Sequence, residues 1–143
     1  MKKSTSNNGI PEDKSLIITL ERGACYGSCP IYSLTIYGDG KVVYKGDIFV
    51  KVVGKVVTKI SKEKVKKLIE AFYKINYFSL KDKYNAHSIT DCPSTETSIT
   101  INGQTKTVYH YHGDFSAPEE LTKLEDKIDK IVNSKRWVKL PSK

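Results

Sequence analysis

The chain has 143 residues, of which 38% are hydrophobic and 28% are charged, a length and composition that suit one domain with a substantial apolar core. It has no run of 18 apolar residues, so we expect no transmembrane helix, and its three cysteines are too few for a disulfide scaffold or for the paired CxxC motifs of a zinc finger. The formal net charge of +8 rests mainly on lysine, which favours a solvated surface.

The first 15 residues are predicted to form a flexible polar tail in front of a single domain that spans residues 16–140. The tail is rich in Ser and Asn and has almost nothing to bury. Lys2 and Lys3 resemble the start of a signal peptide, but no apolar segment follows them. Two interpretations stay open: a cytoplasmic protein, or the linker left after a signal has been removed.

Four strands are predicted in the first half of the domain, because apolar and polar residues alternate there. The strands cover residues 16–22, 31–37, 41–45 and 48–60. Gly38–Gly40 is predicted to be a hairpin turn, since glycine and aspartate accept the positive φ angles that such turns require. Gly54 interrupts the last strand, either as a turn between two strands or as a bulge.

A helix is predicted after these strands, with Ser61 as its N-cap. The apolar residues that recur at helical spacing are Val65, Leu68, Ile69, Phe72 and Ile75. They give the helix one apolar face. Aromatic residues at 77–80 are predicted to pack under the sheet, and residues 81–95 are predicted to be irregular.

The last third is predicted to be a hairpin followed by a second helix. Residues 97–101 and 105–111 pair about the turn Asn102–Gly103. Ser116 and Glu119 have capping-box spacing at the start of the helix. Its apolar face consists of Leu121, Leu124, Ile128 and Ile131. We expect Trp137 to be buried, since a lone tryptophan is rarely left in water.

The resulting order, ββββ-α-ββ-α, predicts an α+β fold with two layers. Short hairpins between the strands favour an antiparallel sheet of about six strands. Because each helix has one apolar face, both helices are expected to cover the same face of the sheet. The residues expected to be buried are Leu20, Leu34, Ile36, Leu68, Phe72, Leu124 and Ile128.

Lysines cluster between Lys41 and Lys67, where nine of them stand against Asp47 and Glu63. Such a stripe can attract nucleic acid or an anionic surface. However, the chain has only two arginines, and arginine is the residue that reads phosphates and bases with a forked guanidinium. We therefore interpret the stripe as a solvated face and do not expect nucleic acid as a partner.

Cys25 and Cys29 lie in a short loop between two predicted strands. Three interpretations stay open: a structural disulfide, two reduced thiols, or a metal or redox site. Gly23 and Gly27 let the backbone bend back on itself, which favours a disulfide that would fix the direction of Tyr26. The spacing is not CxxC, so the redox interpretation lacks its motif.

The cysteine loop also carries a resemblance to a family of uncharacterised, mostly bacterial domains, domain of unknown function 6438, with the motif C-x-G-x-C-P-x-Y. The motif residues here are Cys25, Gly27, Cys29, Pro30 and Tyr32, and the further similarity lies at 38–40, 78–80, Tyr84, 90–93 and 136–137. The resemblance spans roughly residues 16–138 and implies no known activity. Many relatives look secreted or lipid-anchored, which implies an extracytoplasmic location, either periplasmic or surface-anchored.

His110 and His112 lie two residues apart on a predicted strand and therefore point the same way. Both imidazoles are placed to hold one metal ion. Further ligands within reach in the sequence are His87, Asp91, Cys92 and Asp114. Histidines near a strand end are more often surface or half-buried residues, so we expect no metal and no cofactor.

The candidate ligand-binding residues are Tyr26, Tyr84, Asp91 and His110. Neither a nucleophile–base pair nor a cofactor motif stands out, so we predict a noncatalytic domain, expected to be a monomer, that binds an unidentified protein or small ligand. The sheet face opposite the helices, near Tyr37 and the lysines of residues 41–59, is the expected surface. The alternative is an enzyme or metal-binding protein that uses the Cys25/Cys29 loop with Asp91 and His110.

The two irregular segments, the cysteine loop and residues 84–94, are predicted to lie together at one end of the sheet. Most of the motif lies in them, and binding groups often sit on loops that a rigid scaffold holds. Asp91 is the residue that separates two roles for this region. Bonds to amides of the cysteine loop would be structural, whereas a position facing a pocket with Tyr84 or His110 would favour ligand binding.

Overall fold

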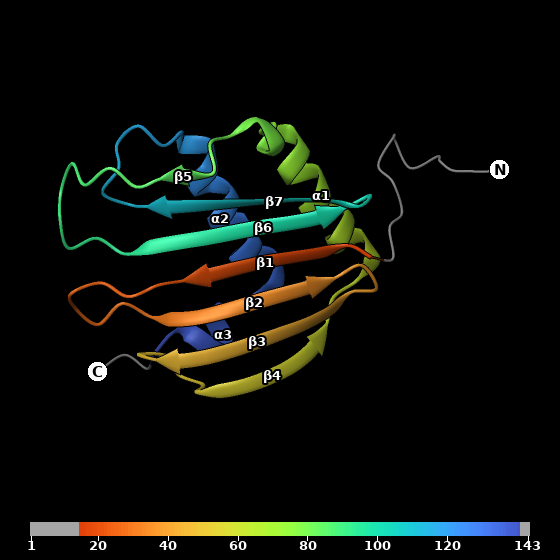
Figure 1. Ribbon diagram of the computed structural model, residues 1–143. Coiled ribbons are helices and arrows are strands. Elements are labelled where there is room, and N and C mark those ends of the chain that lie inside the picture. The colour runs from red at the N-terminus through yellow and green to blue at the C-terminus, as the bar shows by residue number, and fades with distance from the viewer. Residues whose placement is uncertain (1–14, 141–143) are drawn as a thin grey trace.

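Figure 1 shows the computed structural model, in which residues 15–140 are described and nearly all of the predicted tail lies outside that range. Seven strands form one sheet, and the helices pack behind one of its faces. The strands are β1 (Ile17–Arg22), β2 (Ile31–Tyr37), β3 (Lys41–Ile48), β4 (Gly54–Lys59), β5 (Lys83–Tyr84), β6 (Ser94–Ile101) and β7 (Gln104–Tyr111). The predicted order of strands and helices and the two-layer α+β fold are confirmed.

The strands lie in the order β4-β3-β2-β1-β6-β7-β5. Every neighbouring pair is antiparallel except β5 and β7, which run parallel. The sheet is therefore mixed and has seven strands rather than about six. The extra strand, Lys83–Tyr84, lies inside the segment that we predicted to be irregular, because two residues are too few to show an alternating pattern.

The predicted strand at 48–60 is shorter in the structure. β3 continues to Ile48, residues 49–53 make a connection, and β4 begins at Gly54. Gly54 has φ of 109°, a conformation that favours glycine. Of the two roles considered for it, the structure shows the turn between two strands, because β3 ends before the connection and Gly54 begins β4. Within the connection, Val50 is buried, with 5% of it exposed.

Helix α1 (Lys62–Lys74) begins as predicted, since Ser61 Oγ accepts a hydrogen bond from Lys64 N at 3.2 Å. Helix α2 (Glu119–Val132) does not begin with the predicted side-chain cap, because its N-cap is Pro118 and no side chain caps it. The capping-box prediction is wrong because Ser116 Oγ donates to Asp114 Oδ1 at 2.7 Å instead. Two short helices, η1 (Tyr77–Ser79) and α3 (Lys135–Val138), complete the chain.

The core fills the space between the sheet and the helices. All seven residues predicted to be buried have exposed fractions of 2% or less. Trp137 is also buried, with its ring 5.0 Å from that of Tyr44. Its carbonyl accepts a hydrogen bond from Val52 N at 2.8 Å, so α3 ties the end of the chain to the β3–β4 connection.

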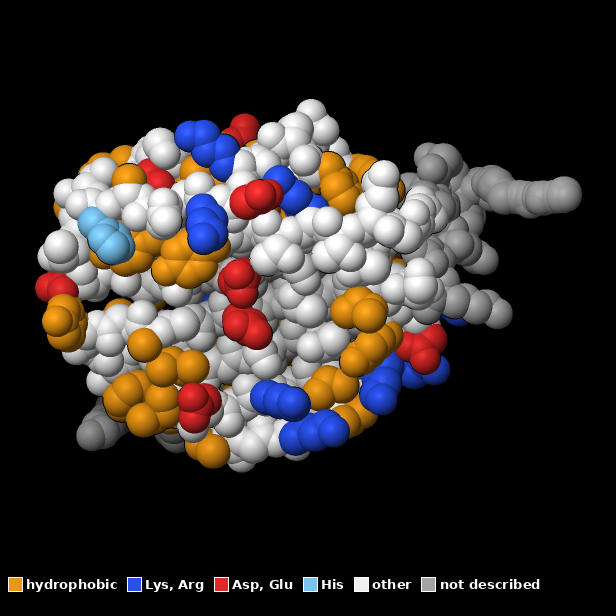
Figure 2. Space-filling model, viewed as in Figure 1, with side chains coloured by type: hydrophobic (Ala, Val, Ile, Leu, Met, Phe, Trp, Pro, Cys, Tyr) orange, Lys and Arg blue, Asp and Glu red, His pale blue; other side chains and the backbone are white. Residues whose placement is uncertain are grey.

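The other face of the sheet is not covered by helices and is mostly polar. Figure 2 shows this face, with lysines gathered over β3 and β4 and acidic side chains near the centre over β1 and β6. The acidic pair is Glu21 and Glu96, which are register partners on neighbouring strands. This is the face that we expected to bind a partner, and that expectation stays a prediction.

Candidate functional site

The two ends of the sheet differ in how the strands are connected (Figure 1). At one end, called here the turn end, β2–β3 and β6–β7 are joined by short turns at residues 38–40 and 102–103. At the other, the loop end, four longer connections meet at residues 23–30, 49–53, 85–93 and 112–118. The candidate site lies at the loop end, where irregular backbone is held by side chains.

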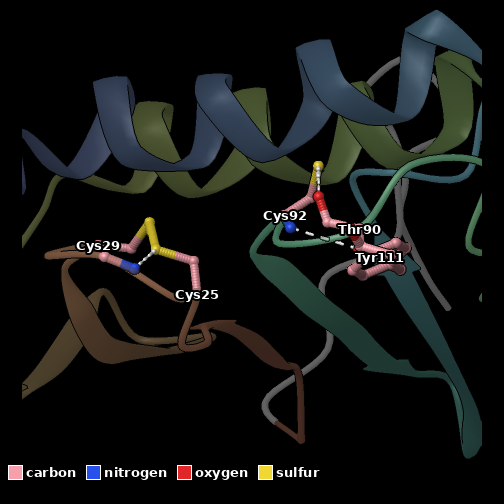
Figure 3. Close-up of a disulfide and its surroundings, with 6 residues drawn as sticks. Cys25, Cys29, Thr90, Cys92 and Tyr111 are labelled. Carbon is pink, nitrogen blue, oxygen red and sulfur yellow. Dashed lines mark hydrogen bonds between the residues drawn. A yellow bond between two sulfur atoms is a disulfide. The ribbon is translucent and has the colours of Figure 1, made fainter.

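The cysteine loop at this end is closed by a disulfide between Cys25 and Cys29, whose Cα atoms are 5.8 Å apart. This confirms the first of the three interpretations of the pair. Gly27 N lies 3.3 Å from Cys25 Sγ (Figure 3). Tyr26, at the tip, is 88% exposed, so the bridge holds an aromatic side chain out into solvent.

The cysteine loop and the segment before β6 lie side by side, as predicted (Figure 3). Gly23 N donates to Ser94 O at 2.8 Å. A Cβ at Gly23 would lie 2.6 Å from Ser94 Oγ, so a larger residue there would force the Ser94 side chain to move. His112 N in turn donates to Pro93 O at 3.0 Å. The first bond joins the cysteine loop to the start of β6, and the second joins the connection before β6 to the connection after β7.

A cleft of about 270 Å³, called here the loop-end cleft, lies between these connections and α2. Cys29, Pro30, Pro93 and Val138 form its apolar wall. Arg22, Thr95, His112 and Asp129 are its principal polar groups. The cleft therefore combines a mainly apolar wall with a few convergent polar side chains, the composition typical of small-ligand sites.

Arg22 is held at the edge of the cleft by α2. Its Nη2 lies 2.7 Å from Asp129 Oδ2 and 3.3 Å from Asp126 Oδ1. Its Nη1 donates to Thr95 Oγ1 at 3.1 Å. With these partners the guanidinium is neutralised by α2 carboxylates, and its role is to join the end of β1 to the helix.

Asp129 is the centre of this anchor. Its Oδ1 accepts hydrogen bonds from the hydroxyls of Tyr32 at 2.7 Å and Ser134 at 2.5 Å. Burial, together with the nearby negative charge of Asp129, raises the pKa of Tyr32 well above its ordinary value. The phenol therefore stays protonated and acts as a hydrogen-bond donor.

Beside the cleft, His110 of β7 and His112, the first residue after β7, meet Glu125 of α2. This group is called here the His–Glu cluster. The rings of His110 and His112 have centroids 4.1 Å apart, which confirms that they point the same way. His110 Nδ1 lies 2.7 Å from Glu125 Oε2, and His112 Nε2 lies 2.7 Å from Thr95 Oγ1. Glu125 Oε1 is buried without a hydrogen-bond partner among the described residues.

Burial decides the charge of the cluster. It lowers the pKa of His112 to about 4, with further lowering by His110 and Arg22. His112 is therefore a neutral imidazole at neutral pH. Burial also raises the pKa of Glu125, although the hydrogen bond from His110 opposes the shift.

The four candidate ligand-binding residues do not share one site. Tyr26 and Asp91 are exposed, and Asp91 has φ of 66°. Tyr84 and His110 are buried register partners on β5 and β7, and the Tyr84 hydroxyl accepts a hydrogen bond from Lys81 N at 3.2 Å. Asp91 neither lines the cleft nor bonds to the described residues of the cysteine loop.

The other candidate metal ligands also lie elsewhere. Asp114 accepts backbone N–H bonds from Ala86 and Ser116 at 3.0 and 2.8 Å, so it holds the turn before α2. His87 packs its ring 4.3 Å from that of Tyr111. The Cys92 thiol contacts Thr90 O at 3.7 Å (Figure 3).

Sequence reasoning missed Glu125, although the helix pattern contains a signal for it. Glu125 lies four residues after Leu121 and three before Ile128, which places it within the apolar stripe of α2. It is fully buried there. A charged residue within an apolar stripe is a recognisable exception, since such groups are buried only with a partner.

Comparison with known protein families supports the family assignment. A family model described as Domain of unknown function (DUF6438) matches residues 16–132. No curated protein matches the chain. Within residues 15–140, no helix has the length and apolar character needed to cross a membrane.

Proposed function

Because the chain belongs to the domain of unknown function 6438 family, whose description assigns no activity, we propose its function from the site itself: a noncatalytic domain that binds a ligand in the loop-end cleft. The observation that carries the proposal is the composition of this cleft. A cleft of about 270 Å³ with a mainly apolar wall lies where the family motif folds. Such a site suits a compact group with an apolar body.

The polar groups of the cleft narrow the class of ligand. Arg22 is neutralised by Asp129 and Asp126, so the cleft offers no free cation for a phosphate or a carboxylate. His112 is neutral at neutral pH for the reason given above. We therefore propose an uncharged, mainly apolar group, such as an aromatic ring of a small molecule or of a protein side chain, oriented by one hydrogen bond to the Thr95–His112 pair.

A noncatalytic role is supported by how the reactive groups are used. The sulfur of Cys29, the cysteine of the cleft wall, is bonded to Cys25, and a disulfide sulfur is not a thiolate nucleophile. Asp91, the carboxylate of the alternative enzymatic hypothesis, is exposed and does not line the cleft. These positions favour binding over catalysis.

We also propose an extracytoplasmic location. The support is the Cys25–Cys29 disulfide, because disulfides persist in oxidising compartments and are rare in the cytosol. The thiol–disulfide state of the protein isolated from its native cells, trapped with an alkylating reagent, tests this. A reduced pair would contradict the proposed location.

The binding proposal is tested with the ¹⁵N-labelled full chain and three probes: indole, benzoate and N-acetyl-tyrosinamide. A metal chelator in every sample keeps the experiment independent of bound ions. We expect indole and the tyrosine derivative to shift amides of residues 23–29, Ser94, Thr95 and His112, and benzoate to shift them less, because the cleft has no free cation.

Two tryptophan variants provide the matched pair. Val138→Trp fills the cleft and should abolish the probe shifts, because Val138 lines the wall. Val57→Trp places the same side chain on β4 at a position that is 54% exposed and should leave the shifts unchanged. Probe shifts on the open face around residues 41–59, or shifts that survive Val138→Trp, would contradict the cleft as the binding site.

A further inference from the structure

We propose that His110, His112 and Glu125 bind one divalent transition-metal ion of the zinc class. This site is distinct from the proposed ligand-binding site, because His112 is the one member of the three that lines the loop-end cleft. Its three donors come from the end of β7, the residue that follows this strand, and α2. A metal ion there would join the sheet directly to the helix that carries Asp126 and Asp129.

The spacing of the donor atoms fits a tetrahedral ion. One nitrogen from each histidine and one oxygen of Glu125 all lie within 4.8 Å of one another. Two ligand atoms on tetrahedral zinc are about 3.3 Å apart, since each bond is about 2 Å long. His110 Nδ1 lies 2.7 Å from Glu125 Oε2, and His112 Nε2 lies 3.7 Å from the other oxygen, Oε1. The two imidazoles therefore flank the carboxylate, at distances on either side of that value.

The second observation is the unsatisfied oxygen of Glu125. Its side chain is fully buried, and Oε1 has no hydrogen-bond partner among the described residues. A buried carboxylate oxygen left without a partner is costly. The polar atom 3.7 Å from it is His112 Nε2, too far for a hydrogen bond but suitably placed for a metal ion between the two atoms.

The charges around the cluster also favour a cation. Arg22 is the nearby positive group, and Asp126 and Asp129 both pair with it. Glu125 is a third carboxylate on the same helix, against this one guanidinium.

The donor set selects the kind of ion. Two imidazoles and one carboxylate suit zinc and its transition-metal neighbours, whereas Ca²⁺ and Mg²⁺ prefer oxygen donors alone. The ion would displace the proton shared by His110 Nδ1 and Glu125 Oε2 and replace the Thr95 hydroxyl on His112 Nε2. Three protein ligands leave a fourth position for water.

The test uses the full chain, purified without a metal-affinity tag, and zinc chloride alone. Calorimetric titration should give one zinc ion per chain with a dissociation constant in the micromolar range or tighter. Co²⁺ at the same site should give visible absorption bands, which report its coordination number. Zinc should also raise the melting temperature, because it binds the folded chain.

Three variants identify the ligands. Glu125→Gln keeps the side-chain shape, and His112→Ala changes a partly exposed residue, with a side chain that is 23% exposed. Each should weaken zinc binding at least about tenfold and remove the melting shift, while circular dichroism confirms that both remain folded. His87→Ala removes a histidine outside the cluster and should bind zinc like the unaltered chain.

Several results would overturn the proposal. They are no zinc bound by the unaltered chain, equal affinity in Glu125→Gln, or loss of zinc in His87→Ala. The first result would leave the cluster as a buried ion pair that anchors α2. Since the cleft experiment is run with a chelator and this one with zinc alone, either proposal can fail without the other.

Discussion

The turn end and the loop end belong to the same sheet, but their connections differ in length and in how their backbone groups are hydrogen-bonded. At the turn end, Asn102 and Gly103 adopt φ of 53° and 77°, and the chain reverses within two residues. At the loop end, each connection is long and irregular, so its backbone groups need partners from elsewhere. This difference places polar side chains, and with them the candidate sites, at the loop end.

The long connections are held by a few shared groups. The Tyr111 hydroxyl donates to Ile89 O at 2.9 Å and accepts from Cys92 N at 3.3 Å. Asp114 accepts hydrogen bonds from the Ser116 hydroxyl and from the backbone of Ala86 and Ser116, and these bonds hold its pKa below the ordinary value, the hydroxyl contributing most. Because each of these side chains makes more than one hydrogen bond to a connection, the loop end should respond to single substitutions much more than the turn end does.

The largest expected effect comes from removing the anchor of the loop end. Asp129→Ala leaves Arg22 without its main partner, and the Arg22 side chain is only 19% exposed. Stranding such a charge should lower the free energy of unfolding by about 3–5 kcal/mol. Urea denaturation measures this loss.

The turn end offers the matched control. Asp39→Ala removes an exposed carboxylate that accepts a hydrogen bond from Lys41 N at 3.0 Å, and it should cost less than about 1 kcal/mol. Equal losses for Asp129→Ala and Asp39→Ala would contradict the contrast between the two ends.

The next effect concerns the packing of α2, on which the loop end depends. Leu124 is 2% exposed on this helix, and Leu124→Ala should cost about 2–5 kcal/mol because it leaves a cavity. Leu140→Ala is the control, since Leu140 is 51% exposed. A cost near zero for Leu124→Ala, measured by urea denaturation, would mean that α2 is not docked as described.

Regular patterns made the fold largely predictable. The predicted strand at 31–37 matches β2 residue for residue, and the buried residues of α1 fall at the predicted spacing. The prediction that failed concerns a side chain with more than one possible hydrogen-bond partner nearby. Ser116 is a plausible cap by sequence, but Asp114, two residues earlier, takes its hydroxyl, and no pattern states which partner wins.

The site was less predictable, because it depends on contacts between distant segments. The disulfide joins residues four apart and was among the interpretations from the sequence. By contrast, the Glu125–His110 and Arg22–Asp129 contacts join residues 15 and 107 apart, and only the packing of α2 on the sheet brings them together. Asp91 lies in residues 90–93, which share the family resemblance, yet it is exposed at the surface.

Removing the disulfide should destabilise the fold less than Asp129→Ala or Leu124→Ala. The double substitution Cys25→Ser and Cys29→Ser frees a loop of only a few residues, which should cost roughly 2 kcal/mol. The fold should remain, because the core is unaffected. Hydrogen exchange should speed up at amides of residues 23–30 and not at the Asn102–Gly103 turn. Faster exchange at both ends would contradict a local role for the bridge.

The smallest effects concern backbone conformation, at one residue from each end. Asp91 and Asn102 both have left-handed conformations, with φ of 66° and 53°. Asp91→Ala and Asn102→Ala should each cost about 1 kcal/mol, because alanine strains in this region. Asp91→Gly should cost less, since glycine adopts positive φ freely.

The same glycine variant separates the two roles considered for Asp91. Because the carboxylate does not line the cleft, Asp91→Gly should leave the indole-induced amide shifts unchanged while its backbone stays relaxed. If the shifts instead disappear in Asp91→Gly but persist in Asn102→Gly, the carboxylate takes part in binding, and the ligand site must extend from the cleft onto the exposed segment before β6. The pair thus tests whether the loop end differs from the turn end in function as well as in architecture.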